Sequence, residues 1–310
     1  MAMRSSDITI SVIIPSVRPD KVFHTLDGLL SQTLATSILE ILVVTPQYNR
    51  ISELKKKSKV NVVTVEELYP PGKMRNIGAR AAIGNYFAFI DDDCIPEGNW
   101  LEKLITEISL HPDVGMIGCR VVSGNKRCWA ECADSSLFAA YQYHKELFID
   151  LGSAAIVVKR QAFAEAEGFD ELLSASEDWD FSLRLRRAGW RCLFTPKAEV
   201  LHFHGRESFV AIASNAYFSG LRSGLTVQKR HYSNMSWLAK ISVRMGTPVW
   251  YCLLILPYAT TLTLMQGVDL IRSDWKRCLH LPMIFICRLL YHCGVWRRLV
   301  QESTLHRGML

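Results

Sequence analysis

Three adjacent carboxylates, Asp91, Asp92 and Asp93, are the side chains of this sequence best suited to chemistry. They follow Tyr86–Ile90, an aromatic and β-branched run that predicts a buried strand ending at the acids. Neighbouring carboxylates repel one another, and a cation that prefers oxygen ligands, such as Mg²⁺ or Mn²⁺, would offset that cost. The alternative interpretation is a solvated acidic turn, because acids also gather in loops.

A second acidic pair, Glu177 and Asp178, stands at the start of a helix expected over residues 174–187. Ser176 is a suitable N-cap, and the helix dipole would favour the ionised form of both acids in the first turn. An ionised, positioned carboxylate can act as a general base. The alternative is that the two acids only stabilise the helix start.

Two histidines, His202 and His204, end the last strand expected before the C-terminal third. Alternation along a strand directs both to the same side, where together they could meet an ion or a phosphate. A zinc site is disfavoured, because two histidines without a cysteine pair nearby are too few ligands. The alternative is a pair of ordinary hydrogen-bonded histidines.

Strands and helices alternate along the first two thirds of the chain, which predicts an α/β fold with a doubly wound, mostly parallel, Rossmann-like sheet. The expected strands are 8–15, 38–44, 60–65, 86–90, 114–122, 152–160, 191–194 and 199–204, and the expected helices are 21–32, 70–80, 100–110 and 174–187. Residues 123–150 are expected to be irregular and to form either an acceptor-facing loop or a second packing layer. Ligands bind such sheets beyond the carboxyl ends of the strands, where Ser16, Thr45 and the aspartates would meet. Lys73 and Arg75 at a helix start would favour an anion there.

Charge is distributed unevenly between the two parts of the chain. Residues 1–204 carry 23 Lys and Arg against 26 Asp and Glu, whereas residues 205–310 carry 13 against 4. A basic tail on a weakly acidic body indicates a partner such as anionic lipid or nucleic acid. The nine cysteines form no C-x-x-C pair, which is typical of reduced cytosolic thiols.

Two apolar runs mark the C-terminal third. Met245–Val268 carries no charge, and its roughly 36 Å length as a helix would cross a bilayer core of ~30 Å. Pro257 would kink such a span. The second run, Leu281–Trp296, is interrupted by Arg288. Basic residues on every side favour a tail that lies in or dips into the cytoplasmic leaflet, with a soluble helical cap as the alternative.

The ordered motifs resemble the family 2 inverting glycosyltransferases of the GT-A type. The matching pieces are Val12-Ile-Ile-Pro15, Arg75-Asn-Ile-Gly78, Phe89-Ile-Asp-Asp-Asp93, Gly168-Phe-Asp-Glu171, Glu177-Asp178 and His202. Together they extend over residues 8–204, in the family's order. The resemblance implies a GT-A fold, with a catalytic domain over residues 1–204 and a helical, basic and apolar, membrane-associated region over residues 205–310.

The resemblance also implies roles for individual residues. Asp93 takes the place of the metal ligand, with His202 near the metal or diphosphate, and Asp91 lies nearer the ribose or base. Asp178 takes the place of the catalytic base. The residues expected on the nucleotide or donor side are Pro15, Ser16, Arg18, Thr45, Arg75, Asp91 and Asp92. Glu177 and Trp179 are expected on the acceptor side.

The implied activity is transfer of a sugar from a nucleotide-diphosphate sugar to a hydroxyl of a lipid-linked or membrane-near glycan, with Mn²⁺ or Mg²⁺ as cofactor. A divalent cation neutralises the departing diphosphate, and one carboxylate deprotonates the acceptor on the opposite face of the sugar. We therefore expect a membrane surface but no nucleic acid as partner, a location on the cytoplasmic face of the membrane, and a part in polysaccharide biosynthesis at the cell envelope.

One departure from the family pattern leaves the nucleotide base open. The family usually places Asp-Asp-Gly-Ser after its second strand, where this sequence has Val43-Val-Thr-Pro-Gln47. Two other functions stay in view. A sugar-phosphate nucleotidyltransferase would need a Gly-rich, Arg-bearing loop after the first strand, which residues 16–20 do not supply. A catalytically silent membrane scaffold would not need Asp91, Asp93 and Asp178 together.

Overall fold

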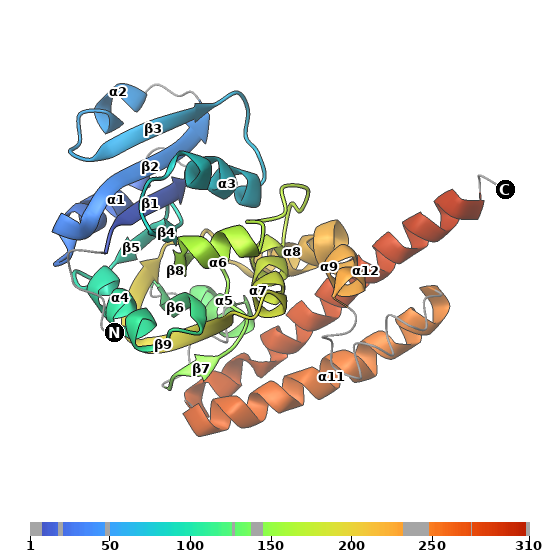
Figure 1. Ribbon diagram of the computed structural model, residues 1–310. Helices are drawn as coiled ribbons and strands as arrows, with labels where there is room; N and C mark the ends of the chain where they lie inside the picture. Colours follow the sequence, from blue (N-terminus) through green and yellow to red (C-terminus); the bar gives the residue numbers. More distant parts are fainter. Residues whose placement is uncertain are drawn as a thin grey trace. The chain divides into compact units, whose positions relative to one another are not determined.

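The chain divides into two compact units in a computed structural model (Figure 1). The structure describes residues 8–17, 21–46, 50–125, 128–137, 145–231, 248–273 and 275–307. Unit 1 comprises Met1–Asn125, Ala140–Leu172 and Glu177–His204, and unit 2 comprises Lys126–Ala139, Leu173–Ser176 and Gly205–Leu310.

Unit 1 is built on one sheet, with strand order β3-β2-β1-β4-β8-β6-β9-β5 and β7 beside β9. Its strands within the described ranges are β1 (Ile10–Pro15), β2 (Ile38–Pro46), β3 (Val60–Val65), β4 (Tyr86–Ile90), β5 (Cys94–Pro96), β6 (Val114–Ser123), β7 (Leu147–Phe148), β8 (Ala155–Lys159) and β9 (Arg191–His202). Strands β1, β2, β3, β4, β6 and β9 run in one direction, and β5, β7 and β8 run in the other. The expectation of a mostly parallel α/β sheet is therefore confirmed.

Two strand predictions need correction. The strands expected over 191–194 and 199–204 are one strand, β9, whose register against β6 shifts between Thr195 and Glu199. Pro196 falls in this irregularity, where a residue without an N–H costs no ladder hydrogen bond. The strand expected over 152–160 begins only at Ala155 and runs antiparallel to both of its neighbours.

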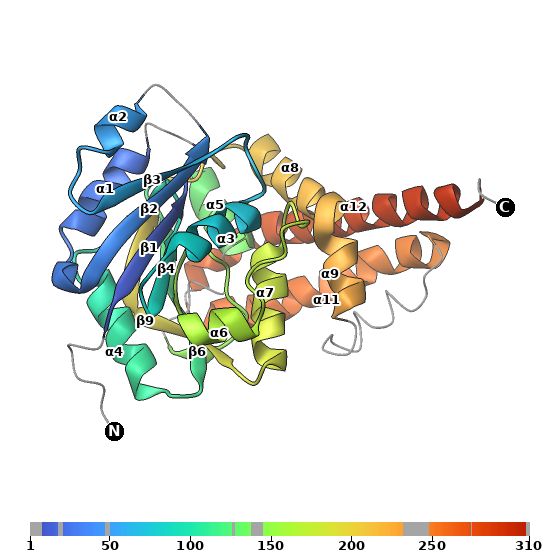
Figure 2. The ribbon, with the colours of Figure 1, turned by 45° about the horizontal axis from the view of Figure 1, so that its top comes forward.

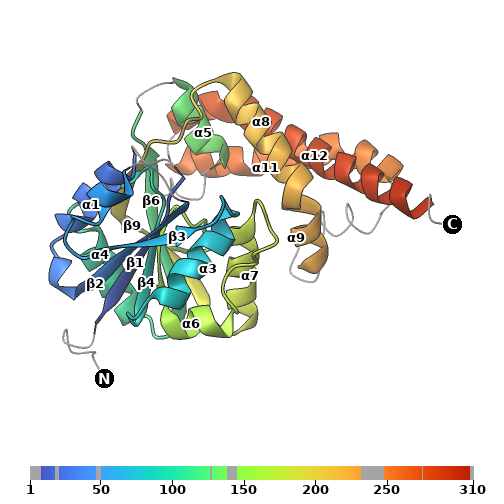
Figure 3. The ribbon, with the colours of Figure 1, turned by 90° about the horizontal axis from the view of Figure 1, so that it is seen from above.

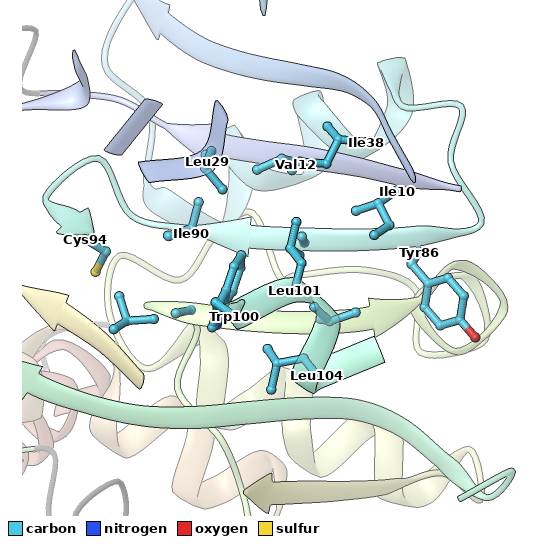
Figure 4. Packing of buried hydrophobic residues seen from close by; sticks show 14 of the residues in the cluster. Ile10, Val12, Leu29, Ile38, Tyr86, Ile90, Cys94, Trp100, Leu101 and Leu104 are labelled. Carbon is cyan, nitrogen blue, oxygen red and sulfur yellow. The ribbon is translucent and has the colours of Figure 1, made fainter. Parts of the chain in front are cut away.

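Helices cover both faces of the sheet (Figure 2). On one face, α1 (Val22–Leu30) and α4 (Trp100–Leu110) bury Leu26, Leu29, Trp100 and Leu101 against alternate residues of β1 and β4. Figure 4 shows Trp100, Leu101 and Leu104 beside Val12 and Ile90 in this core. Fully burying side chains of this kind is worth about 1.5–3 kcal/mol each. The short elements η2 (Ala35–Ser37) and α2 (Ile51–Leu54) lie in the loops around β2.

The opposite face carries α3 (Pro71–Ala81), α6 (Arg160–Glu165) and α7 (Glu177–Arg187). Five phenylalanines form its centre, with ring centroids 4.5–6.2 Å apart: Phe87, Phe89, Phe163, Phe169 and Phe181. Gly78 lets α3 approach β1 closely, because a Cβ there would lie 2.5 Å from Ile13 Cγ2. This approach fixes the helix that carries Arg75.

Unit 2 is helical. Its elements are α5 (Cys128–Leu137), α8 (Phe209–Ser219), the π-helical η4 (Gly220–Gly224), α9 (Leu225–Arg230), α11 (Pro248–Ser273), η6 (Trp275–His280) and α12 (Leu281–Arg307). The long helices α11 and α12 lie side by side (Figure 3). Helix α5 corrects the expectation that residues 123–150 are irregular throughout. Pro257 lies inside α11 without ending it.

Two stretches of the described part of unit 2, Val249–Val268 and Trp275–Thr304, are long and apolar enough to cross a membrane. About one third of each apolar window is buried inside the protein. Much of the rest of α11 is exposed and apolar, including Val249, Trp250, Leu253, Leu256, Leu264, Met265, Val268 and Ile271. Both features are consistent with a membrane-associating tail. Residues 245–247, the start of the apolar run in the sequence, lie outside the described residues.

Candidate functional site

The aspartate triplet lies where β4 ends, between this central strand and β5. The backbone N–H of Asp91 donates to the carbonyl of Ala154 (2.9 Å), which continues the pairing of β4 with β8 for one residue. The side chain of Asp91 is 24 % exposed, whereas Asp92 and Asp93 are buried. The three carboxylates therefore have different surroundings, and each has its own partner.

Arg75 joins the triplet to the second acidic pair. Its guanidinium is 3 % exposed and donates to Asp91 Oδ1 (2.7 Å) and to Glu177 Oε1 (2.9 Å). Burial acts to lower the pKa of Arg75, but the charges of Asp91, Glu177 and Asp178 outweigh it, so the pKa of this guanidinium is raised. Helix α3, through Arg75, thus brings together two carboxylates that lie 86 residues apart in the sequence. In the sequence, Arg75 is expected to contact the nucleotide; in the structure both of its terminal nitrogens meet carboxylates.

Asp178 stands in the first turn of α7, as expected. Its Oδ1 accepts a hydrogen bond from the backbone N–H of Trp179 (2.8 Å). Burial raises the pKa of Asp178 most, and the charge of Asp91 raises it further, against the lowering effects of Arg75 and backbone N–H groups. The carboxyl is thus partly buried and near the triplet, as a general base should be.

Glu177 is more deeply buried than Asp178. Burial and the neighbouring Asp178 raise the pKa of Glu177 to about 7, although Arg75 acts in the opposite direction. Ser176, which the sequence predicts as the N-cap, has φ 60°. This left-handed conformation is uncommon outside glycine.

Asp93 and His202 form the candidate metal centre. His202 Nε2 lies 3.2 Å from Asp93 Oδ1, and both side chains are at most 6 % exposed. Cys94 Sγ completes a group of ligand atoms within 4.8 Å of one another. A carboxylate and an imidazole at this separation fit two ligands of one divalent cation, and the imidazole suits Mn²⁺ better than Mg²⁺.

His204 and the backbone of Phe203 hold this centre in place. His204 is also buried, and its ring packs edge-on against His202 with centroids 5.2 Å apart. The N–H of Phe203 donates to the carbonyl of Asp93 (2.8 Å). Lys21 Nζ donates to the carbonyl of Phe203 (2.5 Å). Neither Lys21 nor Cys94 belongs to a local motif, so sequence reasoning could not select them.

The loop after β1 is tied to the middle aspartate. Asp92 Oδ2 accepts from the N–H of Val17 (2.7 Å), and its carbonyl accepts from Thr25 Oγ1 (3.0 Å). The N–H of Ser16 donates to the carbonyl of Val44 (2.8 Å), and its buried Oγ meets no protein partner within the described ranges. Arg18, expected on the donor side, lies outside the described residues.

Pro15 and Thr45 lie at the ends of the neighbouring strands β1 and β2. Thr45 is 2 % exposed, and its hydroxyl donates to the carbonyl of Pro46 (3.2 Å). It therefore lies at the carboxyl edge of the sheet, as expected, but with its side chain largely covered.

Asn76 and Glu171 connect two of the sequence motifs, Arg75-Asn-Ile-Gly78 and Gly168-Phe-Asp-Glu171. Asn76 donates to the carbonyl of Phe169 (2.7 Å) and to Glu171 (3.1 Å), and its Oδ1 accepts from the N–H of Phe169 (2.9 Å). Arg80 pairs with Glu171 at 2.9 Å. These contacts bind α3 to the Gly168-Phe-Asp-Glu171 turn and so hold Arg75 beside α7.

A pocket of about 460 Å³ lies on the far side of these contacts and is lined by Asn76, Arg80, Phe163, Phe169 and Glu171 among others. It does not include Asp91, Asp93 or Asp178. This pocket is therefore separate from the candidate metal centre and from Asp178.

Known proteins share the sequence motifs and the fold. The family model "Glycosyltransferase like family 2" matches residues 8–216. The pre-mycofactocin glycosyltransferase of Mycobacterium tuberculosis is 32% identical over 166 residues, which cover 51% of this chain and 35% of that protein. The chain thus spans only about a third of this relative's length.

Two further comparisons concern a short match and a solved structure. The N-acetylglucosaminyl-diphospho-decaprenol L-rhamnosyltransferase of M. tuberculosis is 43% identical over 53 residues, or 17% of each chain. Mannosyltransferase PcManGT from Pyrobaculum calidifontis, solved with GDP-Man and Mn²⁺, superimposes with TM-score 0.61 at 14% identity and covers 93% of this chain and 87% of that one. The fold is thus shared with this solved glycosyltransferase, and the family match extends over about two thirds of the sequence. The chain belongs to glycosyltransferase family 2.

Proposed function

We propose that the protein is an inverting glycosyltransferase that moves a sugar from a nucleotide-diphosphate sugar to a hydroxyl of a lipid-linked or membrane-near glycan. The observation that carries the proposal is the Arg75 bridge between Asp91 and Glu177. This bridge holds Asp91, the proposed donor-side acid, close to the first turn of α7, which contains Asp178. Residues 1–204 would form the catalytic domain, and residues 205–310 the membrane-associated region.

The donor would bind at the carboxyl ends of β1, β2 and β4. Asp91 is the exposed member of the triplet and keeps Oδ2 for a ribose or base, since Oδ1 meets Arg75. Ser16 offers a buried hydroxyl, and Pro15, Thr45 and Arg18 would complete this side. Arg75 and Asp92 would not bind the nucleotide themselves. Their contacts support another role: Arg75 positions Asp91, and Asp92 positions the loop after β1.

A divalent cation would be held by Asp93 and His202, and Mn²⁺ is the ion their chemistry favours. When bound, it neutralises charge that develops on the departing diphosphate. The solved mannosyltransferase of the same fold contains Mn²⁺. Cys94 is a softer ligand than such an ion prefers, so its buried thiol is assigned to packing.

Asp178 would accept the proton of the acceptor hydroxyl. The acceptor oxygen then bonds to the anomeric carbon as the bond from that carbon to the diphosphate oxygen breaks, and the electron pair leaves with the nucleoside diphosphate. One attack on the face opposite the leaving group inverts the anomeric centre, so a second carboxylate nucleophile is unnecessary. Glu177 is paired with Arg75, which makes it a positioning residue. Trp179, which is partly exposed, stays assigned to the acceptor side.

The acceptor assignment rests on the tail and on the relatives. The exposed apolar face of α11 supports a membrane surface as the place of reaction, and we propose that this is the cytoplasmic side. One relative is named for a diphospho-decaprenol compound, and an O-antigen biosynthesis protein of Myxococcus xanthus also matches, at 24% identity. We therefore place the activity in polysaccharide biosynthesis at the cell envelope.

The test is a panel of nucleoside diphosphates and nucleotide sugars with purified full-length protein and Mn²⁺. We expect one nucleotide to raise Tm in a metal-dependent way and the corresponding nucleotide sugar to be consumed. Asp93→Ala should abolish both effects while the protein remains folded. Activity that is undiminished in excess chelator would contradict the metal assignment. If no nucleotide binds under any metal, the scaffold is the better reading.

A further inference from the structure

The segment immediately before the proposed base belongs to unit 2. Residues Leu173–Ser176 cluster with the C-terminal helices, and Glu177, the next residue, belongs to unit 1. Leu173 is 4 % exposed although its neighbour Leu172 is 91 % exposed. The chain therefore passes directly from an anchored segment of unit 2 into the first turn of α7, which contains Asp178.

A serine of η4 supplies a hydrogen bond to this segment. The backbone N–H of Ala175 donates to Ser223 Oγ (3.2 Å), and Ser223 is 2 % exposed. Ser176, the following residue, has φ 60°. A non-glycine residue keeps a left-handed conformation only where its surroundings hold it there.

The serine lies in an unusual stretch of helix that is fixed to α12. Residues 220–224 form a π-helical turn between α8 and α9, and such turns are frequent at functional sites. Two glycines make the contact possible. A Cβ at Gly220 would lie 2.0 Å from the carbonyl oxygen of Tyr291, and a Cβ at Gly294 would lie 2.2 Å from that of Tyr217. The two backbones meet directly, so α12 determines where the π-helical turn lies.

We infer that Ser223 is a positioning residue for Asp178, and that the contact of η4 with α12 sets the position of the residue-173–176 segment that delivers the base. The inference rests on the proposed role of Asp178. Its physical content is a chain of contacts: α12 holds η4, Ser223 holds Ala175, and the constrained Ser176 leads into Glu177 and Asp178.

The test compares Ser223→Ala with Ser223→Thr and Ser135→Ala in the full-length protein. Ser135→Ala is the matched control, because Ser135 is a buried serine of unit 2 whose hydroxyl hydrogen-bonds His280 Nδ1 (2.8 Å) away from the segment. The readouts are kcat, KM for the donor, the acid limb of the kcat–pH profile and amide hydrogen exchange at Ala175.

We expect Ser223→Ala to lower kcat about tenfold, to leave donor KM within about twofold, and to accelerate exchange at Ala175, as loss of one hydrogen bond allows. The acid limb should move to lower pH, because a less constrained Asp178 gains water while Asp91, Arg75 and Glu177 remain around it. Ser223→Thr keeps the hydroxyl and should restore most of the activity. Ser135→Ala should leave kcat unchanged.

Two outcomes overturn the inference: kcat within twofold of wild type in Ser223→Ala, or equal losses in Ser223→Ala and Ser135→Ala. Asp178→Asn, measured in parallel, separates this failure from failure of the proposed function. If Asp178→Asn is inactive but Ser223→Ala is not impaired, only the positioning role is wrong. If Asp178→Asn remains active, the base assignment is wrong, and the positioning role falls with it.

Discussion

At the scale of single residues, the site depends on a balance of charge around Arg75. One buried cation faces Asp91, Glu177 and Asp178, so the local net charge is negative when all three acids are ionised. Burial and mutual repulsion therefore raise the pKa of both Glu177 and Asp178. A base with a raised pKa is a better proton acceptor, provided that the working pH lies above that pKa.

The raised pKa of Glu177 predicts a pH-dependent stability. Its folded-state pKa of about 7 exceeds its ordinary value of 4.5, so between these values the folded protein holds more of the proton than the unfolded chain. The stabilisation is fully present below pH 4.5 and is lost as pH rises through about 7. Glu177→Gln, which keeps an oxygen acceptor for Arg75, removes this loss.

We expect the Tm of Glu177→Gln, relative to wild type, to rise between pH 5 and pH 8. Thermal unfolding at several pH values measures this difference. Glu66→Gln is the control, because it removes the same charge at an exposed position. Equal pH dependence in wild type and Glu177→Gln would show that Glu177 is ionised throughout.

At the scale of elements, α3 and β4 position the chemistry, and the close contact of α3 with β1 is essential. Gly78→Ala would place a Cβ 2.5 Å from Ile13 Cγ2, which forces a backbone shift that costs about 1–3 kcal/mol. We expect a lower Tm and weaker donor binding, since α3 carries Arg75. Gly98→Ala is the control, because nothing lies within 4 Å of a Cβ there. Equal stability of the two variants would contradict the account of α3.

Many boundaries of the helices and strands could be predicted from the sequence. Val60–Val65 and Trp100–Leu110 have the boundaries that their apolar patterns predict, and the triplet follows β4 as expected. Patterns of this kind are local. They do not encode the antiparallel direction of β8 or the continuation of β9 past Pro196, both of which depend on neighbouring strands.

The site was predicted less completely for the same reason. The acids and Arg75 each belong to a short motif that can be recognised in the sequence, but the pairing of Arg75 with Glu177 joins residues 102 positions apart. Similarly, Asp91 and Asp92 have the same side chain, and their tertiary contacts, Arg75 with Asp91 and Val17 with Asp92, give them different surroundings. The positive φ of Ser176 has no counterpart in composition or spacing.

At the scale of the whole molecule, the helical unit is expected to place the enzyme at its acceptor. Leu253, Leu256 and Leu264 are 58–66 % exposed and recur along one face of α11. Each Leu that enters the bilayer boundary would contribute about 1.5–3 kcal/mol, and each nearby Lys or Arg about 1 kcal/mol on an anionic leaflet.

We therefore expect the full-length protein to sediment with anionic vesicles, and the triple Leu→Gln variant at these positions to remain in the supernatant. Leu68→Gln and Leu110→Gln are controls, since these leucines are 60 % and 65 % exposed on unit 1. Extraction by alkaline carbonate would indicate a tail lying in the leaflet, whereas resistance would indicate a span. A wild-type protein that stays in the supernatant without detergent would contradict membrane association.

The most direct test of the central claim, that Asp178 is the catalytic base beside a donor site at Asp91, is the effect of Asp178→Asn on turnover and donor binding measured together. Asparagine keeps the shape and the acceptor for the N–H of Trp179 but removes the basicity. The account predicts that kcat falls by roughly 10²–10⁴ while the donor Kd is nearly unchanged. Turnover at the wild-type rate, or a collapse of donor affinity, would contradict it.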